Sequence, residues 1–452
     1  MPTISSEKTY VFESMPVRQA VLKQAMPAVA SQMVVLIYNL ADTYFVGMLD
    51  DPVQTAAVTV AFPAFLMLTA ISNLFGVGGA SRLAQALGRK REDQAAQISA
   101  VSFWGGVCCA LLYALLFALL ARPILALCGA KSDIYDTARG YAQWVIIIGA
   151  LPTVMNTLLA NLTRAEGSAG RAFWGVTLGG LLNIALDPIF ILPQFLGMGA
   201  AGAGAATMIS NLTAALFLLG NILLRPRSTV LRVDPRLLRH AREHAGPILS
   251  IGFPSALQIG LTVVAVAAQA KFVSKYATEA VAGLGIAKKI DNLTLYFSIG
   301  VANGILPMLA YNFSSGNQQR RRDVLKTGCA IALGFSLFTL ALFELFAPQC
   351  TALFIDDPLT IRYGAAFLRR LMVSMPFMSL CYPMIIHFQA IGKVRQSLIC
   401  SVLRKGVLDI PLLFLMDRLF PLYGCMWVQT MVDAISLTAI VYFNRGLKKE
   451  GL

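Results

Sequence analysis

The stretch PVQTAAVTVAFPAFLMLTAISNLFGVGGAS, residues 52–81, contains no charged side chain. A helix of about 20 apolar residues spans a lipid bilayer, and this stretch is longer than that. Backbone polar groups cannot stay unpaired in lipid, so a spanning stretch of this kind must be helical. Four more uncharged stretches exceed the same length, at residues 94–121, 188–224, 245–270 and 292–319. The sequence therefore predicts an all-α polytopic membrane protein.

The overall composition agrees with this prediction. Of the 452 residues, 57% are apolar and 13% are charged, against about 25% charged in an ordinary soluble domain. This excludes a soluble enzyme. The net charge of +14 comes from basic residues in short connections, which orient membrane helices rather than bind nucleic acid. The eight cysteines have no C-x-x-C spacing and are interpreted as small apolar residues, with a disulfide between Cys128 and Cys350 as the alternative.

Proline, glycine and charge punctuation predicts about twelve membrane spans. They lie near residues 18–48, 53–88, 94–120, 135–163, 172–193, 200–224, 247–273, 280–314, 325–346, 360–389, 396–417 and 423–444.

The longest connection divides these spans into six and six. It is a basic segment at 225–246, which separates an N-lobe, 1–224, from a C-lobe, 247–452. The halves match each other: Pro27 meets Pro254 at an offset of 227 residues. Six is an even number, so both lobes keep the same orientation, and we expect two pseudo-symmetric six-helix lobes around a central cleft.

Charge bias in the loops predicts the orientation. With the N-terminus inside, the inner loops and termini carry 23 of the 37 Lys and Arg residues, and the outer loops carry 6. Positive residues favour the cytoplasmic side. Both termini are therefore expected in the cytoplasm.

Two aspartates, Asp42 and Asp187, lie well inside predicted N-lobe spans, where an ionisable side chain is costly and indicates function. Asn39 precedes Asp42 by three residues, and Asn183 precedes Asp187 by four, so each pair shares a helix face. Counting from the outer ends of the spans places both acids at a similar depth, with Thr207 at about the same level. These oxygen-bearing side chains predict a site for Na⁺ or H⁺.

The second lobe differs at this position, since Gln269 replaces Asp42 in the register of the two prolines. The titratable site is therefore predicted in the N-lobe alone. The alternative is that both acids only hydrogen-bond neighbouring helices.

Other polar positions in the N-lobe helices suggest a substrate path. Gln32, Tyr38, Asn156 and Asn161 are candidates to line the cleft, and structural hydrogen bonding is the alternative for each. Pro27 removes a backbone hydrogen bond within the first span and is a candidate hinge, with a static kink as the alternative.

Several motifs together resemble those of one transporter family. They are PAVASQMVVLIYNLADTYFVG at 27–47, LFGVGGASRLAQALGR at 74–89, NLTRAEG at 161–167, LLNIALDPIFI at 181–191 and GAGAATMIS at 202–210. The chain is identified by them as resembling multidrug and toxic compound extrusion (MATE) transporters, and within these the bacterial DinF and MepA-like branch.

The resemblance implies twelve helices in two lobes and cation-driven export by alternating access. It also implies that Asp42, Asn183 and Asp187 form the cation site, with Thr207 where GAGAAT matches the GAALAT of the family.

We therefore expect a bacterial inner-membrane antiporter that exports amphipathic, often cationic, drugs or metabolites in exchange for H⁺ or Na⁺. It is expected to be a monomer in the lipid bilayer, to need no cofactor and no nucleic acid, and not to be an enzyme. One alternative is a lipid-linked oligosaccharide flippase of the same superfamily, whose pyrophosphate would need a cationic cavity; Lys271, Arg369, Arg370 and Arg404 are the span-embedded candidates. The other is an intramembrane enzyme that uses the Asp pair or His240-x-x-Glu243-His244.

Overall fold

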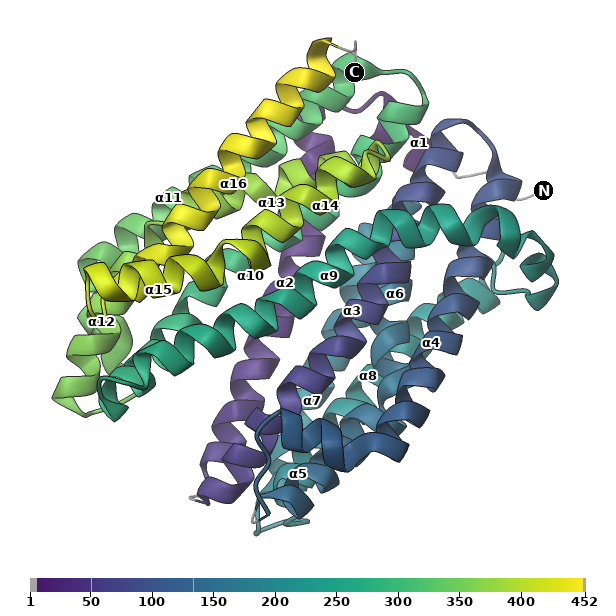
Figure 1. The fold of residues 1–452 in the computed structure, drawn as a ribbon. Coiled ribbons are helices and arrows are strands. Elements are labelled where there is room, and N and C mark those ends of the chain that lie inside the picture. The colour runs from purple at the N-terminus through teal and green to yellow at the C-terminus, as the bar shows by residue number, and fades with distance from the viewer. Residues whose placement is uncertain (1–5, 50, 133, 450–452) are drawn as a thin grey trace.

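Helices make up almost all of the regular structure that the computed structural model describes, which covers residues 6–49, 51–132 and 134–449 (Figure 1). The elements in chain order are α1 (Ser6–Glu13), α2 (Val17–Gly47), α3 (Pro52–Gly88), α4 (Glu92–Leu127), α5 (Tyr135–Ala142), η1 (Gln143–Ile148), α6 (Ala150–Ala165), α7 (Ala169–Ile191), α8 (Gly199–Leu224), η2 (Pro235–His240), α9 (Ala241–Val273), α10 (Thr278–Ser314), α11 (Gln318–Ala352), α12 (Pro358–Met372), α13 (Met375–Ala390), α14 (Val394–Val402), η3 (Leu403–Val407), α15 (Asp409–Leu419) and α16 (Gly424–Lys449).

Nine of the helices in the described part of the chain are long and apolar enough to cross a membrane. Two bent pairs raise this number to 11: α5 and η1 with α6, bent by 50°, and α12 with α13, bent by 46°. The predicted span 396–417 is divided into α14, η3 and α15, which are too short to qualify separately. The prediction of an all-α polytopic protein is confirmed.

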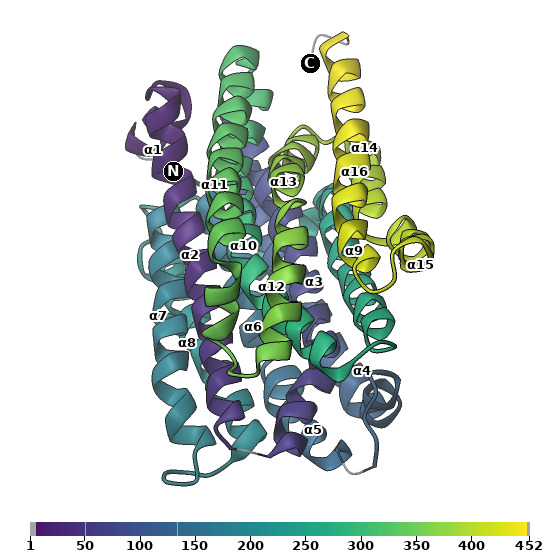
Figure 2. The ribbon, with the colours of Figure 1, turned by 90° about the vertical axis from the view of Figure 1, so that its left-hand side faces the viewer.

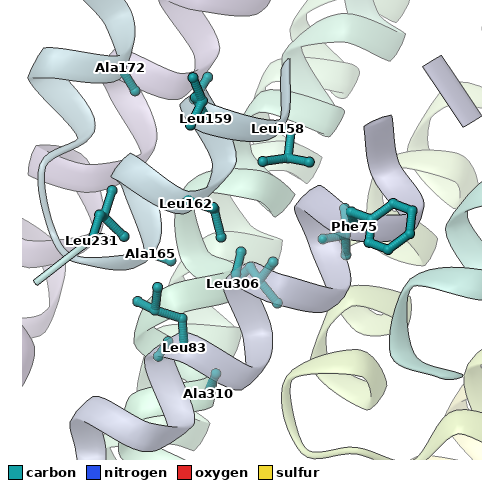
Figure 3. Packing of buried hydrophobic residues seen from close by; sticks show 14 of the residues in the cluster. Phe75, Leu83, Leu158, Leu159, Leu162, Ala165, Ala172, Leu231, Leu306 and Ala310 are labelled. Carbon is teal, nitrogen blue, oxygen red and sulfur yellow. The ribbon is translucent and has the colours of Figure 1, made fainter. Parts of the chain in front are cut away.

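The two lobes share one hydrophobic core at one end of the bundle. We call this the basic end; the loops 89–91, 225–234 and 315–317 lie there, and so do α1 and the last turns of α16 (Figure 2). Its core joins Phe75 and Leu83 of α3 to Leu306 and Ala310 of α10, together with side chains of α6 (Figure 3). Side chains of α4 and α13 also belong to this core.

At the opposite end each lobe has a core of its own. One core lies around Tyr141 and Ile191 in the N-lobe, and the other around Phe272 and Phe367 in the C-lobe. Neither of these two clusters contains residues of the other lobe. The lobes are thus held together at the basic end, and each is packed separately at the other.

Glycines allow the close approach of the lobes. A Cβ atom at Gly252 of α9 would lie 1.8 Å from the main-chain oxygen of Leu74 in α3. One at Gly304 of α10 would lie 2.5 Å from the Cα atom of Ala25 in α2. Larger residues at either position would push the helix backbones apart.

The segment before the first long helix crosses to the other lobe. Arg320 of α11 donates from Nε to the main-chain oxygen of Phe12 and from Nη2 to those of Val11 and Met15, at 2.6, 3.1 and 2.7 Å. The carbonyls of Val11 and Phe12 lie in the last turn of α1, where backbone acceptors lack partners within the helix, and that of Met15 follows the helix. The sequence did not predict α1.

The cysteines are free thiols, including Cys128 and Cys350, so the alternative of a disulfide between those two is wrong. Cys128 lies at the end of α4 in the N-lobe, and Cys350 lies near the end of α11 in the C-lobe.

Candidate functional site

Asp42 and Asp187 lie on neighbouring helices of the N-lobe, α2 and α7 (Figure 2). Their carboxyl groups are close enough to interact electrostatically. Asn183, one turn before Asp187, donates from Nδ2 to Asp187 Oδ1 at 3.2 Å. Asp187 is 0% exposed and Asn183 is 1% exposed. The structure thus brings together three of the residues predicted for the cation site.

Each of these three residues keeps a buried oxygen without a hydrogen-bond donor. The atoms are Asp42 Oδ1, Asn183 Oδ1 and Asp187 Oδ2. Buried polar atoms in folded proteins normally have partners, so three unpartnered acceptors in one place need an explanation. Carboxylate and amide oxygens are the ligands that hard cations prefer, and carboxylates also bind protons. The geometry fits a proton or a small monovalent cation.

Tyr141 of α5 also faces this site, and the sequence analysis missed it. Its ring is 4% exposed, and its hydroxyl lies close enough to interact electrostatically with Asp42, Asp187 and Tyr38. The available signal was weak, because Tyr141 follows Asp136 and Arg139 just before the apolar stretch that begins at Trp144, whereas Tyr38 lies within an apolar stretch. Because α5 is short and amphipathic, its inward face could not be assigned before the bend between η1 and α6 was known.

The other two residues predicted for the cation site have different surroundings. Asn39 donates from Nδ2 to the main-chain oxygen of Val35 at 2.8 Å, so its amide donor is used within α2. Thr207 is buried on α8, which packs against α7. Their place in the cation site stays a prediction.

The four residues predicted to contact substrate are spread over the N-lobe. Asn156 donates to Asn211 Oδ1 at 2.9 Å and thereby links α6 to α8. Asn161 accepts from Arg164 Nη1 at 3.0 Å in a buried position. Both therefore have structural hydrogen bonds, as the alternative interpretation proposed.

Tyr38 and Gln32 lie on α2, the N-lobe helix that packs along α10 of the C-lobe. Tyr38 interacts electrostatically with Tyr296 of α10 as well as with Asp42. It therefore lies between the carboxyl groups and the other lobe. Gln32 is half-buried, six residues or about 1.7 turns nearer the basic end.

Pro27 lies within α2, which is a single helix from Val17 to Gly47. The hydroxyl of Ser31 donates to the main-chain oxygen of Pro27 at 2.9 Å. The role of Pro27 as a hinge stays a prediction.

The basic residues that a flippase would need do not gather into one cavity. Arg404 pairs with Asp433 at 3.0 Å, Arg369 lies 3.7 Å from Glu344, and Arg370 stacks on the ring of Tyr423. Lys271 is exposed on α9. Each is therefore placed by a local contact or faces outward, which leaves no shared pyrophosphate site among them.

The histidine pattern in the basic connection also has local contacts. His244 is 3% exposed, and its Nε2 lies 2.9 Å from Gln97 Oε1. No group of three or more metal-ligating side chains occurs among residues 6–49, 51–132 and 134–449.

Comparison with known proteins gives matches over nearly the whole chain. The MatE family model matches twice, at residues 27–189 and 254–415, once in each lobe. Multidrug export protein MepA of Staphylococcus aureus is 29% identical over 446 residues, covering 98% of this chain and 97% of its own. The MepA protein of Staphylococcus saprophyticus is 26% identical over 447 residues, with the same coverage of both chains.

Solved structures agree with these sequence matches. An outward-facing multidrug resistance MATE family transporter of the MOP superfamily superposes with a TM-score of 0.92 at 25% identity, covering 99% of this chain and 100% of that one. A MOP superfamily transporter from Pyrococcus furiosus, described by a reverse polarity of its binding pocket, gives 0.86 at 25% identity over 97% and 96%. The resemblance drawn from the motifs is confirmed, and the chain belongs to the MatE family of multidrug efflux transporters.

Proposed function

We propose that this protein exports amphipathic, cationic solutes across a bacterial inner membrane in exchange for H⁺ or Na⁺, which binds in the N-lobe at Asp42, Asn183 and Asp187. One observation carries the proposal. Asp42, Asn183 and Asp187 each have a buried oxygen without a hydrogen-bond donor, and the two carboxyl groups interact with each other. A bound cation or proton removes both the repulsion and the missing hydrogen bonds.

Helix α2 can connect ion binding to the movement of the lobes. It carries Asp42 in its second half, and Ala25 and Val29 in its first half. Ala25 and Val29 lie against Gly304 and Gly300 of α10 at the lobe contact. A change in the tilt or bend of α2 on ion binding therefore alters the packing between the lobes, and Pro27 lies between these contact residues.

Export by this route requires two states. In the described state the basic end is closed by the shared core. With the basic end in the cytoplasm, as the loop charges predict, the lobes of this state are joined on the inner side and packed separately on the outer side. Ion binding at the N-lobe would favour release of the solute and return to the inward-open state, provided that the ion binds the two states with different affinity.

Efflux of a fluorescent cation such as ethidium from proteoliposomes tests the proposal. A proton gradient and a sodium gradient are imposed separately on wild type and on Asp42→Asn. We expect exchange under one of the gradients in wild type, and a loss of about tenfold or more in the variant, which corresponds to at least about 1.4 kcal/mol of coupling. Asp93→Asn, at an exposed aspartate of α4, is the control.

Unchanged gradient-driven efflux in Asp42→Asn would contradict the assignment of the ion site. Absence of dye exchange under either gradient in wild type would contradict the antiport itself.

A further inference from the structure

The C-lobe contains a small polar cavity that the proposed function does not use. Gln269 of α9, Lys288 of α10, Lys405 of η3, Asp409 of α15 and Gln429 of α16 line it. These elements are the first, second, fifth and sixth spans of their lobe. The N-lobe carboxyl groups lie on its own first and fifth spans, α2 and α7.

The sequences of the two lobes relate the sites residue by residue. Gln269 takes the place of Asp42 in the register that matches Pro27 with Pro254. At an offset of 222 residues, five fewer than that of the prolines, Leu408-Asp409 matches Leu186-Asp187, and the residue four positions earlier is Lys405 in one lobe and Asn183 in the other. The C-lobe cavity is therefore the pseudo-symmetric counterpart of the N-lobe site.

The two sites differ in charge. The N-lobe site has two carboxyl groups and no basic side chain among its three predicted ligands. The charged groups that surround Lys405 in the C-lobe are Lys288, Arg404, Asp409 and Asp433. Asp291 also interacts with Lys405, so three basic and three acidic side chains balance each other there.

Local pairs account for most of these charges. Lys288 lies 3.4 Å from Asp291, and Arg404 lies 3.0 Å from Asp433. Lys405 donates to the amide oxygen of Gln429 and makes no ion pair within the described part of the chain. Asp409 accepts from the backbone N–H of Gly406 at 2.9 Å and likewise has no ion pair there. The ammonium of Lys405 and the carboxylate of Asp409 are the remaining opposite charges on the cavity wall.

Hydrogen bonding differs between the sites in the same way. The N-lobe site has three buried oxygens without donors, whereas no side-chain oxygen of Gln269, Asp409, Gln429 or Asp433 is among the buried unpartnered atoms. The C-lobe site therefore has no buried oxygen that lacks a donor among these four residues; its unpartnered buried atom is a nitrogen, Arg404 Nη1.

A break in the backbone accompanies the lysine. Lys405 has φ −140° and ψ 91°, and Gly406 has φ 150° and ψ −78°, inside the span formed by α14, η3 and α15. The φ of Gly406 is one that side-chain-bearing residues rarely adopt. Irregular backbone at membrane depth is tolerated where it lines a cavity or is buried in protein. The corresponding N-lobe helix, α7, runs as one helix from Ala169 to Ile191.

We propose that the Lys405 ammonium is a built-in cation that occupies the C-lobe counterpart of the coupling-ion site. The protein then takes up its coupling ion in the N-lobe only, and the C-lobe cavity binds Na⁺ or H⁺ only when the charge at position 405 is removed. This inference rests on the proposed function for its meaning in transport, but the binding property can be tested separately.

The test uses the full-length protein in detergent with the N-lobe site disabled by Asp42→Asn and Asp187→Asn. Thermal unfolding is followed with Na⁺ replaced by N-methyl-D-glucamine at constant ionic strength, and in a second series with decreasing pH. We expect no response to Na⁺ in this background. Adding Lys405→Gln to this background should lower the Tm in Na⁺-free buffer at neutral pH. Na⁺ or acid should then raise the Tm again, because a ligand that binds only the folded state stabilises that state.

Three further variants separate this effect from a packing role of the lysine. Lys405→Arg keeps the charge and should not respond to Na⁺, and neither should Lys271→Gln at an exposed lysine of α9. Lys405→Gln combined with Asp409→Asn removes both charges, and should restore the Tm without any response to Na⁺ or pH.

A Tm of Lys405→Gln that stays low in Na⁺ and in acid, and that Asp409→Asn does not rescue, would overturn the inference. If Lys405→Gln alone cannot be purified, the variant that combines Lys405→Gln with Asp409→Asn decides. Failure of this combined variant to fold would also overturn the inference. The proposed function fails on a different result, the lack of gradient-driven dye exchange in wild type.

Discussion

Gln85 of α3 donates from Nε2 to the main-chain oxygen of Ala390 at the end of α13, 2.8 Å away, and this hydrogen bond joins the two lobes at the basic end. Ser81, one turn earlier, donates to the oxygen of Gln389 at 2.9 Å. Both donors are buried. These bonds must break if the lobes separate at this end, so they contribute to the relative stability of the closed state.

Replacing Gln85 by Leu should shift the population away from the state closed at the basic end. One buried hydrogen bond contributes about 1 kcal/mol, which is about a fivefold change in an equilibrium. Double electron–electron resonance measures the populations of the closed and separated states. The spin labels are placed at the exposed positions 196 and 353, one in each lobe, both at the end away from the basic end. Ser336→Ala is the control, because Ser336 bonds to Ser379 within the C-lobe. An unchanged distance distribution in Gln85→Leu would show that this bond does not hold the lobes.

A valine at Gly304 should separate the lobes more strongly. Its Cβ would lie 2.5 Å from the Cα atom of Ala25 and 3.0 Å from the backbone nitrogen, so α2 and α10 must move apart. We expect the same change in the spin-label distances together with slower dye efflux. Gly334→Val in α11 is the matched control, since a Cβ there meets no atom within 4 Å. Equal effects of both valines would contradict a specific role of the helix contact.

Breaking the buried pair of Arg404 and Asp433 should be strongly destabilising. Both side chains are 1% exposed or less, and the guanidinium also stacks over Tyr382 at 4.1 Å. Arg404→Leu leaves a buried carboxylate without its partner, at a cost of about 3–5 kcal/mol in unfolding free energy. Equilibrium unfolding in detergent measures this loss, and Arg404→Leu combined with Asp433→Leu should recover a large part of it. Lys275→Ala, which removes an exposed pair with Asp417, should cost about 1 kcal/mol or less.

Tyr141→Phe should weaken binding of the coupling ion without abolishing transport. The substitution removes only the hydroxyl that faces Asp42 and Asp187. A change of about 1 kcal/mol corresponds to about a fivefold higher ion concentration for half-maximal exchange. Tyr113→Phe is the control, because the hydroxyl of Tyr113 donates to the main-chain oxygen of Ala64, in the same lobe. The same ion dependence in Tyr141→Phe and wild type would exclude this role for Tyr141.

The start of α12 should loosen in acid. The side chain and backbone N–H of Thr360 donate to Asp357, and these hydrogen bonds lower the pKa of its carboxyl group. A lowered pKa in the folded state means that the stabilisation is present at neutral pH and is lost as the pH falls through that lowered value. Hydrogen exchange of the first turn of α12, corrected for intrinsic rates, should therefore increase in acid. Asp357→Asn should show faster exchange at neutral pH and little further change on acidification.

Local sequence predicted the helices well because each span is a continuous apolar stretch. The two bent pairs were predicted as single spans, since a bend of 50° or 46° changes no residue type. The break at Lys405 and Gly406 was not predicted. The neighbouring Arg404 pairs with Asp433, 29 residues away along the chain, and no local pattern indicates that contact.

The sequence by itself determined that the chain folds into membrane helices, and it predicted a division into six and six spans with Asp42 and Asp187 as candidate ion-binding acids of the N-lobe, because hydropathy, charge bias and i, i+4 spacing are local properties. Only the tertiary structure decided that Tyr141 joins those acids, that Asn156 links α6 to α8 while Asn161 bonds Arg164 within α6, and that Lys405 and Asp409 line one cavity. It also decided at which end the lobes touch. The physical reason is that helix rotation and the approach of separate helices depend on packing between residues far apart in the chain, which no single span encodes.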